Sequence, residues 1–305
     1  MTMIVQGENQ GNWIDVKCIS VFCLLWLCIT AQAATPFTVT DVSGAQITFV
    51  TPPQRIISLA PNLTELAYAA GMGGRMVAVT AYSDYPQQAK QLPQVGDAFR
   101  LDWERLVALK PDLVLAWGSG LSSRDRATFE KMKLKVLVLE PRRLDDIPKT
   151  LRLLGRIIGN DTVAEASVRA FVQQLDTLRR QYSGHAPVRA YFQITAAPLL
   201  TVNEAHIISD VLRLCGAQNV FAVVPLLTPA ISNEALVKEN PQVMLAIAAT
   251  HEQEEEIKRT WRGLPLNAVR QDRMAFIQPD LISRSTPRIL LGAKQICEQI
   301  ELTRF

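Results

Sequence analysis

The glycine, serine and histidine patterns that could carry catalysis are each incomplete. Residues 118–123, GSGLSS, follow an apolar run, but Ser123 stands where a dinucleotide-binding fingerprint needs its third glycine. No glycine-rich loop is followed by a Walker lysine, and no G-x-S-x-G nucleophile elbow occurs. The three histidines, His185, His206 and His251, lack the close spacing of a zinc site. We therefore expect no catalytic centre, no metal site and no resident cofactor.

A fourth motif, RIISLAPNLTEL at residues 55–66, joins an apolar run to a helical pattern. Pro61 ends the run, Asn62 can cap a helix, and Thr64 and Glu65 place polar groups in its positively polarised first turn. From these residues alone, the motif is a well-formed strand-to-helix turn.

The elements around these motifs alternate between short apolar runs and helical stretches, after a β-hairpin predicted at residues 37–50. Such alternation is typical of an α/β lobe with a mainly parallel sheet. The runs are 55–59, 76–80, 112–117 and 135–139, and the helical stretches are 64–71, 102–110, 124–133 and 144–157.

Residues 161–182 contain no Gly or Pro and predict one helix of about 33 Å, long enough to connect two lobes. The alternation then resumes and ends in a helix at 287–302. The predicted fold class is α/β, with two similar lobes of mainly parallel sheet joined by one long interlobe helix. We expect the N-terminal lobe at 34–158, the helix region at 159–184 and the C-terminal lobe at 185–305.

An internal repeat supports two similar lobes. Residues 102–116 align without a gap on residues 232–246, with six identities. Among them are Glu104 with Glu234 and Pro111 with Pro241. Chance and the shared sequence rules of helices are the alternative explanation.

The N-terminal 33 residues predict a signal peptide. An apolar run at 18–29 leads into an A-x-A motif, so we expect cleavage near Ala33. A membrane anchor is the alternative, but the run is shorter than the ~20 residues that cross a bilayer. Acidic residues before the run, Glu8 and Asp15, fit a leader poorly and suggest a start downstream of Met1.

The composition of the chain excludes further classes of protein. With 305 residues, 48% hydrophobic and 20% charged, the chain is predicted to fold, and its net charge of +3 does not indicate a nucleic-acid surface. After cleavage two cysteines remain, Cys215 and Cys297. An even pair in an oxidising compartment predicts a disulfide between them.

Residues 55–66, with Gly71, Tyr82–Pro86 and 106–114, closely resemble the periplasmic binding proteins for cobalamin and ferric siderophores. The resemblance covers Phe37 to the C-terminus. It is closest to the cobalamin-binding members, on residues that include Trp117-Gly118, Cys215-Gly216, Asn219–Phe221 and Asp280 to Arg288.

The resemblance implies a ligand cleft between the lobes, with aromatic walls suited to a corrin ring. Its predicted residues are Tyr82, Phe99 and Trp117, with Asp280, Leu281, Ile282, Ser283 and Arg284 from the other lobe. The alternative roles are structural: core aromatics at strand ends, and a cap for the terminal helix.

Five positions expected to carry further cleft aromatics do not: Ala98, Ile194, Leu199, Thr228 and Leu281. A cleft with fewer rings suits another corrinoid, haem or a ferric chelate as well as cobalamin.

The expected function is a monomeric, non-catalytic periplasmic receptor that binds cobalamin or a related corrinoid and delivers it to an inner-membrane ABC permease dimer. Glu104 and Glu234 match the family's transporter-docking acids. A ferric-siderophore or haem receptor of the same fold is the first alternative. An exported two-lobed enzyme is the second, and it would need an acid/base cluster in the cleft.

Overall fold

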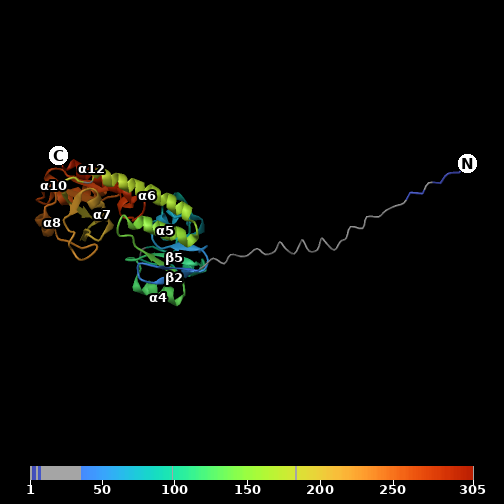
Figure 1. Ribbon diagram of the computed structural model, residues 1–305. Helices are drawn as coiled ribbons and strands as arrows, with labels where there is room; N and C mark the ends of the chain where they lie inside the picture. The colour runs from blue at the N-terminus through green and yellow to red at the C-terminus, as the bar shows by residue number, and fades with distance from the viewer. Residues whose placement is uncertain (1, 5, 8–35, 98, 183, 305) are drawn as a thin grey trace. The chain divides into compact units, whose positions relative to one another are not determined.

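Two four-stranded parallel sheets, one in each half of the chain, form the framework of this computed structural model. The structure describes residues 2–4, 6–7, 36–97, 99–182 and 184–304. The apolar run and cleavage motif of the predicted signal peptide, together with Ala98, lie outside these residues. From Phe37 onward the chain forms one unit, and the predicted two-sheet α/β class is confirmed (Figure 1).

The first sheet has the strand order β4-β3-β5-β6, and the second has the order β10-β7-β11-β12. Their buried strands are short apolar runs, as parallel sheets covered on both faces require. The first sheet consists of β3 (Ile56–Ser58), β4 (Met76–Val79), β5 (Leu113–Trp117) and β6 (Val136–Leu139). The second consists of β7 (Val188–Gln193), β10 (Ala217–Asn219), β11 (Val243–Ile247) and β12 (Met274–Ile277).

Helices lie between the strands and after the last strand in both halves. In the first half they are α2 (Pro61–Ala69), α3 (Trp103–Ala108), α4 (Ser123–Lys131) and α5 (Asp146–Ile158), with 3-10 turns at Gly73–Arg75 and Gln87–Gln91. In the second half they are α7 (Ile207–Leu214), α8 (Asn233–Glu239), α9 (His251–Arg262), α10 (Asn267–Arg270), α11 (Pro279–Ile282) and α12 (Ile289–Leu302). None of the helices in the described part of the chain has the length and apolar character that a membrane crossing requires.

Two small antiparallel pairs complete the fold. The predicted hairpin is β1 (Phe37–Thr40) with β2 (Gln46–Phe49). The sequence did not predict the second pair, β8 (Thr195–Ala196) with β9 (Leu199–Leu200), because strands of two residues have no hydrophobic period.

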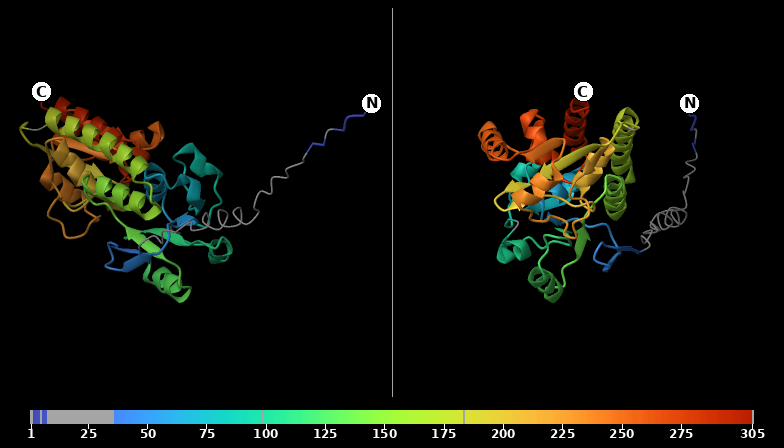
Figure 2. Two further views of the ribbon diagram at one scale, coloured as in Figure 1. Left: turned by 45° about the vertical axis from the view of Figure 1, so that its right-hand side comes forward. Right: turned by 90° about the vertical axis from the view of Figure 1, so that its left-hand side faces the viewer.

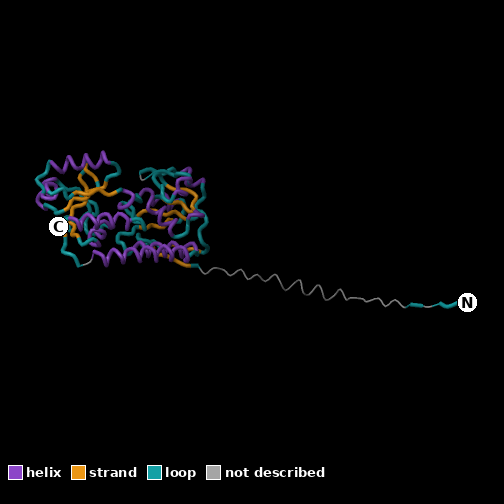
Figure 3. Tube along the Cα trace, turned by 90° about the horizontal axis from the view of Figure 1, so that it is seen from above, coloured by secondary structure: helices purple, strands orange, loops and turns teal. Residues whose placement is uncertain are grey.

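The long helix α6 spans Asp161–Tyr182, the bounds that the sequence predicts. It packs on α5 and α2 in the first half and on α12 and α7 in the second (Figures 1 and 2). Seen from above, the two groups of strands lie side by side along it (Figure 3). Its buried residues recur every three or four positions: Ala164, Val168, Phe171, Leu175, Leu178 and Tyr182.

Close packing fixes the start of α6. A side chain at Gly155 of α5 would place its Cβ 2.4 Å from the Cβ of Ala164, so only glycine permits this approach. Ser167 Oγ also donates to the carbonyl of Ala69, at 2.7 Å. One helix is thereby bound firmly to the first half while its other end packs on the second.

The internal repeat corresponds to equivalent structural units. Asp102 caps α3 and Ser232 caps α8, each accepting a backbone N–H three residues on. Equivalent residues with positive φ follow the two helices, Lys110 at 47° and Asn240 at 40°, and each is followed by a proline. The strands that follow, β5 and β11, begin at equivalent positions of the repeat.

The same equivalence extends to long-range hydrogen bonds. The side chain of Asp112 accepts the backbone N–H of Arg55, and that of Gln242 accepts the N–H of Arg189. In return, the backbone N–H groups of Asp112 and Gln242 donate to the carbonyls of the same two arginines. Shared helix rules do not produce these contacts, so the repeat reflects two copies of one folding unit.

The predicted disulfide is confirmed. Cys215, at the C-cap of α7, bonds to Cys297 of α12 across a sequence separation of 82 residues. Both cysteines are fully buried. The bond ties the first helix of the second half to the terminal helix.

Replacing both cysteines by alanine should lower the free energy of unfolding by about 4 kcal/mol, because the bond restricts the unfolded chain across a long loop. Urea denaturation of oxidised wild type and of the double variant measures this. As a control, reductant should weaken the wild type and leave the variant unchanged. Equal stability of the two oxidised proteins would contradict the prediction.

Candidate functional site

Two cavities open at the carboxyl ends of the strands and share Pro61 and Trp117. In open α/β sheets this edge is where ligands bind. One cavity, of about 190 Å³, lies within the first half. The other, of about 570 Å³, is lined by residues of both halves. Together we call them the interlobe cleft.

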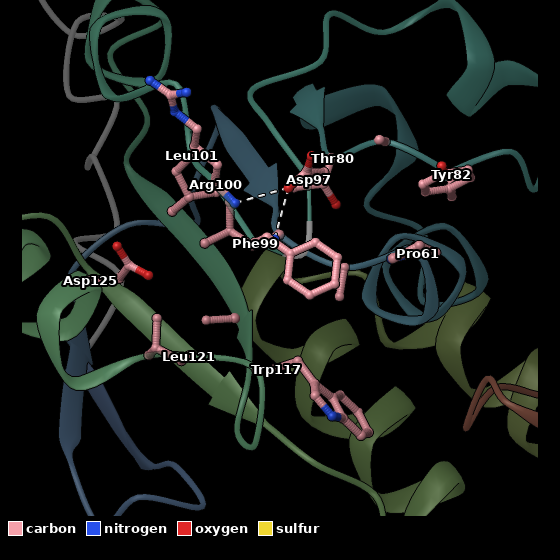
Figure 4. A pocket seen from close by; sticks show the side chains of 15 residues that line it. Pro61, Thr80, Tyr82, Asp97, Phe99, Arg100, Leu101, Trp117, Leu121 and Asp125 are labelled. Atoms are coloured by element: carbon pink, nitrogen blue, oxygen red, sulfur yellow. Dashed lines mark hydrogen bonds between the residues drawn. The ribbon is translucent and has the colours of Figure 1, made fainter. Parts of the chain in front are cut away.

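The smaller cavity brings together three of the predicted site residues, Tyr82, Phe99 and Trp117 (Figure 4). Tyr82 is 79% exposed and Phe99 is 98% exposed, whereas Trp117 packs partly on the core. Asp97 accepts the backbone N–H groups of Phe99 and Arg100, at 2.8 and 2.9 Å. Both hydrogen bonds lower the pKa of Asp97, and the bond from Phe99 has the larger effect. They also hold the loop that presents Phe99.

Tyr82 has a left-handed backbone, with φ at 65°. This conformation is unfavourable for a tyrosine, typically by about 1–3 kcal/mol, and persists only where its surroundings hold it. Its carbonyl accepts the N–H of Asp84 at 3.0 Å and Nη2 of Arg284 at 3.2 Å. Arg284, from the second half, therefore helps to hold an exposed aromatic of the first half in place.

Nine of the fourteen residues that line the larger cavity are polar or charged. Its lining comes from β3–α2, β5 and the segment after β6 on one side, and from α7, the 227–228 loop and the segment after α11 on the other. The residues are Pro61, Asn62, Trp117, Ser119, Glu140, Pro141, Arg142, His206, Ile207, Leu227, Thr228, Ser283, Arg284 and Ser285.

Of the predicted run 280–284, the structure places Ser283 and Arg284 in the larger cavity. Among the described residues that line the two cavities, Asp280, Leu281 and Ile282 do not occur. Ile282 is fully buried in the core, and Leu281 packs against Gly292 of α12. Asp280 forms an ion pair with Arg284 at 2.8 Å. The assignment of this run to ligand binding stays a prediction.

Arg284 is the centre of an ion-pair network between the two halves. Its side chain is 11% exposed, and Nη1 donates to Glu65 at 2.9 Å and to Asp84 at 2.7 Å. Burial alone would lower the pKa of Arg284, but the bonds to Glu65 and Asp84 raise it above its ordinary value. The guanidinium therefore stays charged while shielded from water.

Asp84 responds in the opposite direction. Burial raises its pKa, but the hydrogen bond and charge of Arg284 outweigh burial, so the net pKa is below the ordinary 3.8. Its stabilising contribution is therefore present above that ordinary value and is lost as the pH falls through the lowered pKa. Because 44% of this side chain is exposed, solvent weakens the effect.

Sequence reasoning placed Glu65 at the start of a helix but missed its role in joining the two halves. Its carboxylate is 2% exposed and accepts from Arg284, from Thr286 Oγ1 at 2.9 Å and from Arg288 Nη1 at 3.1 Å. The Arg288 guanidinium also lies 4.1 Å from the ring of Tyr85. Because α2 begins at Pro61, Glu65 lies beyond the first turn predicted for it and within a stretch, 62–67, in which every residue is buried. An acid next to the apolar helix positions Leu63 and Leu66 was the available signal.

A second polar bridge joins the halves at α7. Asp210 accepts the backbone N–H of Leu144 at 2.8 Å and lies 3.5 Å from the guanidinium of Arg143. Arg213 also contacts Asp210. With α6, these two bridges fix the width of the cleft.

His206 begins α7 and reaches the larger cavity. Burial, and secondarily the charge of Arg142, lower its pKa to about 4, so the imidazole is neutral at pH 7. Arg142 itself pairs with Glu140 at 3.1 Å. Among the described residues, no group of three or more His, Cys, Asp and Glu side chains is arranged to hold a metal ion.

The two predicted docking acids occupy equivalent places. Glu104 and Glu234 are exposed in the first turns of α3 and α8. Hydrogen bonds from Ser232 and from its own backbone N–H lower the pKa of Glu234. Both helices precede parallel strands, so their N-termini lie at the cleft edge of each sheet.

The fold and the cleft define a two-lobed substrate-binding protein. Residues 56–281 match the family described as "Periplasmic binding protein", and the chain belongs to this family. Members of the family are non-enzymatic components of transport, in agreement with the expectation that this chain is not an enzyme.

Individual members of the family are similar to this chain over most of its length. The vitamin B12-binding protein of Pectobacterium carotovorum subsp. carotovorum (strain PC1) is 38% identical over 250 residues, covering 81% of this chain and 88% of that protein. The crystal structure of the periplasmic vitamin B12 binding protein BtuF of Vibrio cholerae has a TM-score of 0.76 at 34% identity, covering 83% and 99%. A periplasmic heme binding protein from Pseudomonas aeruginosa has a TM-score of 0.71 at 25% identity, covering 81% and 92%.

Replacing Glu65 by glutamine should lower the free energy of unfolding by about 3 kcal/mol, because the partly buried Arg284 and Arg288 lose a charged partner. Thermal or urea denaturation at pH 7 measures the change. Glu256→Gln, on the exposed face of α9, is the matched control and should unfold like the wild type. If the two variants are equally stable, the bridge does not hold the lobes together.

Proposed function

We propose that this chain is a periplasmic substrate-binding protein that captures cobalamin or a related corrinoid and delivers it to an inner-membrane ABC importer. The observation that carries the proposal is the interlobe cleft, which has aromatic residues on one side and polar groups on the other. A corrin ring has broad apolar faces and an edge of amide groups. Vitamin B12-binding relatives that align over more than 80% of the chain support the same ligand.

Each lobe contributes one part of the proposed ligand site. Tyr82, Phe99 and Trp117 supply apolar contact from the N-terminal lobe, residues 34–158. Ser283 supplies a polar group from the C-terminal lobe, residues 185–305, and Arg284 of the same lobe holds the backbone of Tyr82 in place. The two polar bridges and α6 favour a cleft that is formed before the ligand arrives, which lowers the conformational cost of binding.

Export follows from the N-terminal sequence. The apolar run at 18–29 and the A-x-A motif would direct the chain to the periplasm, with cleavage near Ala33. The relatives described as periplasmic support this location.

A haem or ferric-siderophore receptor is the second candidate. It is favoured by Ile194, Leu199 and Thr228, which are not aromatic at positions expected to carry cleft aromatics, and by the similarity to a heme binding protein. Native mass spectrometry of the mature protein mixed with cyanocobalamin, haemin and a ferric hydroxamate separates the candidates. Retention of cyanocobalamin alone supports the proposal, and retention of another ligand in its place overturns it.

The mature protein should bind cyanocobalamin with one-to-one stoichiometry, and Trp117→Ala and Tyr82→Ala should each weaken binding by roughly 1–3 kcal/mol through loss of an aromatic contact. Titration calorimetry measures both effects. Met132→Ala, an exposed apolar residue at the end of α4, is the control. Absence of heat, with no corrin retained on gel filtration, would rule out the ligand assignment.

Charge reversal at Glu104 and Glu234 should block uptake without changing ligand affinity. A permease with two-fold symmetry needs one contact from each lobe, and arginines are natural partners for carboxylates. Glu104→Arg and Glu234→Arg are compared, singly and together, in a cobalamin uptake assay. Glu130→Arg and Glu256→Arg, exposed on other helices, are matched controls. Wild-type transport by the double variant, or loss of its ligand binding, would contradict the docking role.

A further inference from the structure

The hydrogen bond by which His206 caps α7 determines which of its ring nitrogens carries the proton. As the N-cap residue, it accepts the backbone N–H of Ile208 at Nδ1, with a distance of 3.2 Å. A ring nitrogen that accepts a hydrogen bond carries no proton. The single proton of the neutral imidazole is therefore assigned to Nε2, on the opposite side of the ring.

The environment keeps this tautomer in place. The ring is neutral at pH 7, because partial burial and Arg142 both disfavour the imidazolium. The charged groups that line the same cavity are engaged elsewhere: Glu140 pairs with Arg142, and Arg284 with Glu65, Asp84 and Asp280. Of the hydrogen bonds formed by the described residues, none uses Nε2 of His206.

His206 lines a cavity of about 570 Å³ whose other side includes Trp117, so this N–H is the polar group that its ring can offer to a ligand there. A ligand that fills the cavity and offers no acceptor would leave the donor without a partner, at a cost in affinity. A metal-binding role requires the opposite tautomer. Coordination through Nε2 would move the proton to Nδ1 and remove the cap of α7.

We infer that His206 determines specificity in the cleft by donating a hydrogen bond from Nε2 to an acceptor oxygen on the ligand, and that it does not serve as an axial metal ligand. The inference rests on the proposed corrinoid-binding function. Two acceptors of a complete corrinoid fit: the carbonyl oxygen of a side-chain amide on the ring, and a phosphodiester oxygen of the nucleotide loop.

Two variants separate donation from helix capping. His206→Ser keeps a good N-cap residue and removes the imidazole donor, whereas His206→Ala removes both. We expect both variants to bind cyanocobalamin roughly 5- to 30-fold more weakly, the loss of one hydrogen bond. Only His206→Ala should also show a lowered Tm. His251→Ala, at the exposed start of α9, is the control and should bind normally.

Dicyanocobinamide, which lacks the nucleotide loop, identifies the acceptor. If His206→Ser also weakens dicyanocobinamide binding, the partner is a ring amide; if it weakens only cyanocobalamin, the partner is the phosphodiester. Full affinity of His206→Ser for cyanocobalamin overturns the inference and leaves the proposed function intact. Failure of the wild type to bind either corrinoid overturns both. A histidine-ligated haemin spectrum in the wild type that disappears in His206→Ser also overturns the inference.

Discussion

The buried carboxylate of Glu65 is the constraint on which the arrangement of the two lobes depends. A charge shielded from water requires hydrogen-bonded partners of opposite charge, and here all of its side-chain partners come from a segment more than 200 residues away. Arg284, Thr286 and Arg288 meet Glu65 only in one relative position of the lobes. Moving the lobes apart would expose an unpaired acid and two arginines. The bridge therefore opposes opening, and Asp210 and α6 act in the same direction at other points.

A cleft held in this way binds by complementarity more than by closure. Little conformational entropy is lost when the ligand enters, but the shape and polarity of the walls must already be correct. The left-handed conformation of Tyr82 is consistent with this demand. Strain at this exposed position is tolerated because Arg284 holds its carbonyl, so the network that joins the lobes also positions a wall of the cleft.

The sequence predicted the features that depend on local pattern. The bounds of α6, the hairpin, the two sheets and the repeat follow from periodicity, caps and proline breaks, and the disulfide follows from export and cysteine count. It did not predict the partners of Glu65 or Asp210, because pairs formed across the fold have no spacing that a pattern can detect. The run 280–284 shows the same limit. Its residues are adjacent in sequence, yet the short helix α11 turns Ile282 into the core and Ser283 toward the cavity.

Arg284 shows why a predicted binding residue and a structural one can be the same side chain. Its guanidinium contacts three carboxylates, so direct contact with a ligand would have to compete with charges already paired at 2.7 to 2.9 Å. The hydrogen bond from its Nη2 to the carbonyl of Tyr82 is already formed and does not require any of these ion pairs to break. The influence of Arg284 on a bound ligand is therefore best understood as positional: it sets the lobe spacing and holds Tyr82. Direct polar recognition is then left to cavity-lining groups outside this network, such as His206, whose Nε2 forms no hydrogen bond with the described residues.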